Sequence, residues 1–116
     1  MAVSVDRESW ERRWSADPTL RPEGLKLIRG EWVLQLSPRK TLVTIFAATA
    51  TALIVARVVE WLLLRGDWKI RRSPKGEWII DYMWNDGRTF HARYDDPLDA
   101  LGAAVDEVLA GREAAL

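Results

Sequence analysis

The chain of 116 residues has no cysteine and only one histidine, His91. The absence of cysteine excludes disulfide bonds, thiolate metal sites and a cysteine nucleophile, and it is typical of proteins in a reducing compartment. The sequence also has no glycine-rich phosphate loop and no serine-hydrolase or zinc-protease motif. We therefore expect a cytoplasmic protein that is not an enzyme and holds no cofactor. The first 14 residues contain no apolar run, so we expect no cleaved signal peptide.

Net charge is also missing, because 17 basic residues cancel 17 acidic ones. A neutral total argues against long-range attraction to nucleic acid. The hydrophobic share of 48% is typical of a globular chain. Seven tryptophans are many for this length, and each has a large apolar ring with one hydrogen-bond donor. We expect several of them to lie at an interface.

His91 and a group of aspartates are the residues that could carry chemistry. A lone histidine acts as a general base only with an orienting carboxylate or a nucleophile nearby, and Asp81 could approach it from the neighbouring predicted strand. We favour a surface histidine, because no partner motif accompanies it. Asp95, Asp96 and Asp99 could bind a cation, but an N-cap and a first-turn acid explain Asp96 and Asp99. We favour capping and expect no metal site.

No glycine, proline, asparagine or aspartate occurs in the 27 residues 39–65. One interpretation is a strand over 41–47 followed by a helix from about 50 to 64. The alternative is one helix from Pro38 to Arg65, in which 41–64 is long enough to span a membrane. Arg57 and Glu60 oppose the second interpretation, since a charge at the centre of a span costs about 2.5–3.5 kcal/mol.

The rest of the chain divides into an N-terminal part and two similar units. Residues 1–24 predict a helix followed by a connector. Ser4 can cap this helix, and Asp6 lies in its first turn. Trp10 and Trp14 are four residues apart and should share one face of the helix. Residues 30–36 (GEWVLQL) and 76–82 (GEWIIDY) match at an offset of 46 residues, which suggests an internal duplication.

Each unit predicts three strands followed by a helix. In the first unit, 25–66, we expect strands at 25–28, 32–36 and 41–47, with a turn at 37–40. In the second, 67–116, we expect strands at 68–73, 78–84 and 88–94, a hairpin turn at 85–87, and a helix from Pro97 that ends at Gly111. The fold class is therefore α+β: an N-terminal helix and two βββα units whose antiparallel sheets are covered by helices. The expected core comprises Trp32, Leu34, Ile54, Val58, Leu62, Ile80, Phe90, Leu101, Val105 and Val108.

The second unit carries the best candidate for a binding site. Basic residues neutralise phosphates, and aromatic rings stack on bases. Strand alternation, however, places Lys69 and Arg71 on one face and Trp68 and Arg72 on the other, and charged edge strands often only prevent aggregation. The candidate binding residues are Trp68, Lys69, Arg71, Arg72, Lys75, Arg88, His91 and Arg93.

The order of elements over 67–111 resembles the small arm-type DNA-binding modules of phage integrases. The resemblance is one of element order and transfers no binding residue. The helix that follows Asp95 is acidic, unlike the basic surface that the resemblance implies.

The interpretation that we favour is a small binding or accessory module that acts through protein–protein contacts. An apolar helix in the first unit needs a second cover, so we expect a homo-oligomer. The first alternative is a nucleic-acid-binding accessory protein that uses the basic hairpin 69–75. The second is a single-span membrane protein with a C-terminal α+β head.

Overall fold

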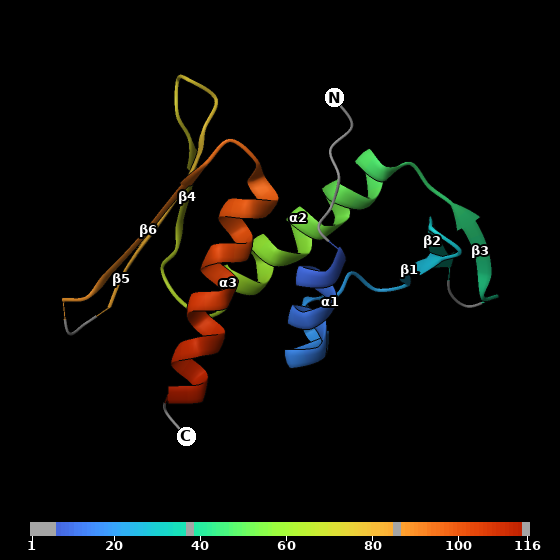
Figure 1. Cartoon of the computed structure of the whole chain (residues 1–116), viewed down its shortest axis with the longest axis horizontal. Coiled ribbons are helices and arrows are strands. Elements are labelled where there is room, and N and C mark those ends of the chain that lie inside the picture. Colours follow the sequence, from blue (N-terminus) through green and yellow to red (C-terminus); the bar gives the residue numbers. More distant parts are fainter. Residues whose placement is uncertain (1–6, 37–38, 85–86, 115–116) are drawn as a thin grey trace. The chain divides into compact units, whose positions relative to one another are not determined.

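The computed structural model describes residues 7–36, 39–84 and 87–114, and it confirms the α+β class (Figure 1). The chain forms two compact units, Met1–Arg57 and Val58–Leu116. The first contains α1 (Arg7–Ala16), the 3-10 helix η1 (Pro18–Leu20), β1 (Leu25–Ile28), β2 (Glu31–Leu36), β3 (Thr41–Thr44) and the start of α2 (Ala47–Leu63). The second contains the end of α2, then β4 (Lys69–Arg72), β5 (Trp78–Met83), β6 (Thr89–Tyr94) and α3 (Pro97–Ala114).

Helix α1 is short and has one tryptophan-bearing face. The rings of Trp10 and Trp14 lie with their centroids 6.4 Å apart, which confirms that these residues share a face. The predicted cap Ser4 and the first-turn acid Asp6 lie outside the described residues. Asp17 ends the helix region and starts η1, since its carboxylate accepts a hydrogen bond from the backbone N–H of Thr19 (3.0 Å).

The first sheet has the strand order β1-β2-β3 and is antiparallel throughout. A tight turn at Arg29 and Gly30, with φ of 52° and 79°, joins β1 to β2, and glycine adopts such positive values without a Cβ clash. Because directly opposite residues project to the same face, one face carries Leu25, Leu27, Trp32, Leu34, Leu36 and Val43. The other face carries Lys26, Ile28, Val33, Gln35, Leu42 and Thr44.

Two residues of the expected core in the first sheet are not fully buried. Trp32 and Leu34 are only half-buried, whereas Val33, which projects to the opposite face, is buried. Val33 lies on the central strand, with Lys26 and Thr44 directly opposite it on the two neighbouring strands. The prediction was wrong here because it assumed that a helix covers the face of Trp32 and Leu34. Among the described residues, α2 makes no packing contact with β1–β3 comparable to that of α3 with its own sheet.

The segment 41–64 forms a strand and a helix, so the alternative of one continuous helix is wrong. Lys40 has φ of 55°, which no right-handed helix contains, and the β-branched residues that follow it pair with β2. Helix α2 starts at Ala47, earlier than expected, and its Ile54, Val58 and Leu62 are buried as predicted. No helix within the described ranges is both long enough and apolar enough to cross a membrane.

The second unit forms a sheet in the order β4-β5-β6, with α3 against it. Helix α3 lies along one face of this sheet, and it packs against β5 and β6 (Figure 1). Ile80, Leu101 and Val105 are buried as predicted, while Phe90 and Val108 are half-buried. The hairpin turn expected at Asn85 and Asp86 lies outside the described residues.

The two ends of α3 differ in how well the sequence predicts them. Asp96 caps the start, since its carboxylate accepts a hydrogen bond from the backbone N–H of Leu98 (2.9 Å), as expected for this residue. The predicted stop at Gly111 is wrong, because the helix continues to Ala114. Gly111 is helical with no atom within 4 Å of where a Cβ would stand, so it neither turns the chain nor permits a close contact.

The units agree at the matching positions of the repeated sequence. Gly30 and Gly76 both have positive φ (79° and 85°) before a central strand. Val33 and Ile79, 46 residues apart, are both buried at the middle of that strand. The internal duplication itself remains a prediction.

Candidate functional site

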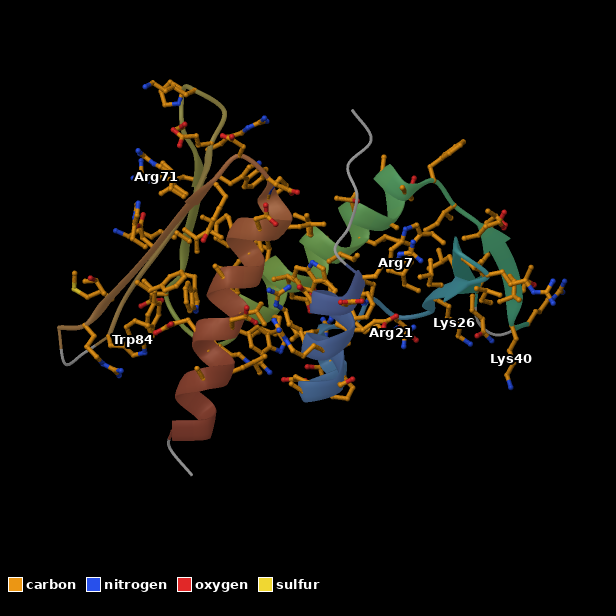
Figure 2. All side chains as sticks on the ribbon, viewed as in Figure 1. Arg7, Arg21, Lys26, Lys40, Arg71 and Trp84 are labelled. Carbon is orange, nitrogen blue, oxygen red and sulfur yellow. The ribbon has the colours of Figure 1, made fainter. Side chains whose placement is uncertain are left out.

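The register of the second sheet separates the eight predicted binding residues. Lys69, Arg71, His91 and Arg93 share one face with Ile79 and Asp81. We call these six residues the open face. Figure 2 shows Arg71 on the side of the sheet away from α3. Trp68 and Arg72 belong to the other face, Lys75 lies in the turn between β4 and β5, and Arg88 precedes β6. The expected split of Lys69 and Arg71 from Arg72 is confirmed.

Asp81 is the centre of a charged cluster on the open face. It lies directly between Lys69 on β4 and His91 on β6. Nδ1 of His91 hydrogen-bonds to Oδ1 of Asp81, which confirms that these side chains meet across the hairpin. On the other carboxylate oxygen, Oδ2 lies 3.8 Å from Nε of Arg71. One carboxylate thus faces a guanidinium and an imidazole.

A second ion pair reduces the positive charge of the open face further. Nε of Arg93 lies 3.8 Å from Oε2 of Glu77. Arg71 and Arg93 therefore each have an acidic neighbour on the central strand or at its start. A phosphate backbone would have to displace these carboxylates, and such exposed pairs are individually weak.

Ile79 gives the open face a structural role. It is only 1% exposed, and the register places Arg71 and Arg93 directly on either side of it. Long basic side chains commonly cover apolar surface with their stems while their heads stay in water. We therefore expect the aliphatic stems of Arg71 and Arg93 to cover the side chain of Ile79 while their guanidinium groups stay in water.

A hollow of about 490 Å³ lies at the end of the open face near His91. Its walls mix acids, bases and apolar side chains: Asp67, Lys69, Asp81, Tyr82, Met83, Thr89, Phe90 and His91. A general base needs a nucleophile or a bound substrate at its second nitrogen, and the hydrogen bond that the structure gives His91 goes to Asp81. Across the described residues, no three His, Asp or Glu side chains converge as metal ligands would.

The aromatic residues of the second unit contact each other. Trp68 is buried and stacks on Tyr82, with ring centroids 4.6 Å apart, and it meets Phe90 edge-on at 5.7 Å. The guanidinium groups of Arg72 and Arg88 lie over Trp78 and Trp84, at 5.8 Å and 5.0 Å from the ring centroids. Trp68 thus belongs to the core, and it offers no ring face for a base to stack on.

The first sheet holds an exposed apolar group that sequence reasoning missed. Its members and their exposed fractions are Leu36 (45%), Leu42 (55%), Val43 (40%) and Phe46 (83%). Leu42 and Val43 project to opposite faces of β3, and Phe46 follows this strand. Contiguous exposed apolar surface commonly marks a contact site, whereas single exposed apolar residues are normal. The sequence alone does not predict this exposed group, because residues 41–46 are equally compatible with part of a buried helix.

Strand β3 also differs from the other edges of the two sheets. Each sheet has two edge strands, which are β1 and β3 in one and β4 and β6 in the other. β1 carries Lys26, β4 carries three basic residues, and β6 carries Arg93. The four residues of β3 (TLVT) carry no charge, and Lys40, labelled in Figure 2, comes immediately before this strand. Charges on an edge strand keep other strands from pairing with it. β3 lacks this protection.

Comparison of the chain with protein-family models, with curated proteins and with solved structures found no match.

Proposed function

We propose that the chain is a non-catalytic binding module that acts through protein–protein contacts and associates with itself. The observation that carries this proposal is the exposed apolar group around β3, on a strand edge without charge. Burying apolar surface yields about 25 cal/mol per Å², so a partner that covers these side chains gains free energy. The charged face of the second unit offers no comparable gain.

Nucleic-acid binding by the hairpin 69–75 is a weaker candidate. Its cations lie on different faces of the sheet, and acidic side chains stand beside Arg71 and Arg93. The total charge is zero. No observation favours this function over protein contacts.

Sedimentation equilibrium of the full chain tests the proposal. We expect a reversible dimer whose dissociation constant increases when Leu42 and Phe46 are both changed to serine, since this removes exposed apolar surface beside β3. The matched control changes Leu63 and Leu64 to serine; these leucines are also exposed, at 53% and 74%, but they stand at the end of α2, in the second unit, and belong to neither β3 nor its sheet. The control should leave the constant unchanged. A chain that stays monomeric up to ~1 mM, where even weak contacts are populated, would overturn the proposal.

A further inference from the structure

The free edge of β3 presents a defined set of backbone hydrogen-bonding groups. The backbone N–H of Ile45 donates to the carbonyl oxygen of Trp32 (2.9 Å), so these opposite residues form a hydrogen-bonded pair. Bonded and non-bonded pairs alternate along an antiparallel ladder. Val43 therefore bonds to Leu34 on β2, and the N–H and C=O groups of Leu42 and Thr44 point away from β2.

Water hydrogen-bonds to these four outward groups in the free chain, and a strand is the partner that can replace all of that water at once. The side chains beside them support the same conclusion, because Leu42 and Val43 are exposed on opposite faces. A helix or loop packed on one face would cover only one of them. A strand added at the edge continues both faces at once and also satisfies the backbone groups.

A second copy of β3 fits this edge in one symmetric register. Two identical antiparallel strands are related by a twofold axis that passes between two directly opposite residues, so one residue pairs with itself. With Val43 at the axis, Leu42 of each copy lies opposite Thr44 of the other. All four outward groups of each copy are then used, in four hydrogen bonds.

The neighbouring registers leave groups unpaired. With Leu42 at the axis, Thr44 would face Lys40 of the second copy, which has φ of 55° and is not extended. With Thr44 at the axis, Leu42 would face Phe46, whose carbonyl oxygen already accepts a hydrogen bond from the N–H of Ala50 (3.0 Å). Only the register centred on Val43 uses residues that are extended and free on this side.

We propose that two chains associate by pairing their β3 strands around a twofold axis at Val43, forming one six-stranded sheet; this rests on the self-association proposed above. The cross-strand pairs are Val43 with Val43, Leu42 with Thr44, and Thr41 with Ile45. The first pair is apolar, and each of the other two joins an aliphatic side chain to a threonine. Branched residues such as valine, isoleucine and threonine are common in strands and pack well across them. No charged residue faces another of the same sign in these pairs.

A single cysteine in the otherwise cysteine-free chain tests the register. Val43 would form a non-hydrogen-bonded pair with itself, in which Cα atoms lie about 4.5 Å apart, within the range for a disulfide. Thr41 is the matched control, since its two copies would lie roughly 14 Å apart along the strands. Under mild oxidation Val43→Cys should form a covalent dimer, and Thr41→Cys should stay monomeric on a non-reducing gel.

A second pair of variants does not depend on oxidation. Thr44→Lys places a charge opposite Leu42 of the second copy, and we expect it to raise the dissociation constant at least ~10-fold. Ile28→Lys adds the same charge to the other edge of the sheet and should leave the constant unchanged.

The outcomes separate this inference from the proposed function. Equal cross-linking at positions 41 and 43, or a dimer that tolerates Thr44→Lys as well as Ile28→Lys, would overturn the β3 pairing and leave self-association standing. A wild-type chain that is monomeric at every concentration would overturn both.

Discussion

Ile45 donates its backbone N–H to the carbonyl oxygen of Trp32, and this one hydrogen bond fixes which groups of β3 are free. Because the ladder alternates, Val43 points its backbone groups toward β2, while Leu42 and Thr44 point theirs outward. Two adjacent residues of one short strand thus have different roles. One holds the strand in its own sheet, and the other is available to a partner.

Proline substitutions at these neighbours should have opposite effects. Leu42→Pro removes an N–H that points outward, which an edge strand tolerates, so the monomer should keep its stability and lose self-association. Val43→Pro removes an N–H that bonds to β2, so the monomer should lose about 3 kcal/mol of unfolding free energy. Urea denaturation at low concentration and sedimentation together measure both effects. If Leu42→Pro destabilises the monomer and Val43→Pro does not, then the N–H of Leu42, and not that of Val43, bonds to β2, and the assignment is wrong.

Gly66→Ala should destabilise the second unit. A Cβ at this position would stand 2.6 Å from Cε2 of Tyr82. The Tyr82 ring has little room to move, since it stacks on Trp68 and meets Trp84 edge-on at 4.8 Å. We expect a loss of about 1–3 kcal/mol in thermal or urea unfolding.

Gly111→Ala is the control for the preceding change. The position is helical and a Cβ there meets no atom, so alanine should stabilise the chain by about 0.5–1 kcal/mol. A Gly66→Ala chain as stable as wild type would show that Tyr82 is not confined as the structure has it.

Ile79→Ala should cost about 3 kcal/mol, because it empties a fully buried position on the central strand. Met83 lies on the same strand and the same face but is 69% exposed, so Met83→Ala should change the unfolding free energy by less than about 0.5 kcal/mol. Urea unfolding followed by tryptophan fluorescence measures both. Similar small losses in both variants would contradict the burial of Ile79 beneath Arg71 and Arg93.

Asp96→Ala should cost about 1 kcal/mol, since the N–H of Leu98 loses its acceptor at the start of α3. Asp95→Ala removes an exposed neighbouring carboxylate of the same charge and should stay within about 0.5 kcal/mol of wild type. If both variants lose the same unfolding free energy, the effect comes from negative charge near the start of α3 and not from the hydrogen bond of the cap.

The sequence predicts the second unit best because its signals are local. Asp96 followed by Pro97 marks the helix start, and branched and aromatic residues on either side of a turn mark β5 and β6. The meeting of His91 with Asp81 follows from strand alternation and register alone.

The first unit was harder to predict because its key properties are not local. Thr41–Thr44 suits a strand or a helix by composition, and its pairing with β2 decides the outcome. The burial of Val33 in place of Trp32 and Leu34 depends on what covers each face of the sheet, which periodicity does not reveal. The exposed edge of β3 depends on sheet order, so no pattern within the strand itself could show it.

Residue-resolved amide hydrogen exchange, followed by NMR at low and high protein concentration, tests the central claim most directly. The account predicts that the amides of Val43 and Ile45 are protected at both concentrations, because they bond within the sheet. The amides of Leu42 and Thr44 should gain protection only at the higher concentration, when a second β3 covers them. Free exchange of Leu42 and Thr44 in a sample that is dimeric by sedimentation would contradict the account.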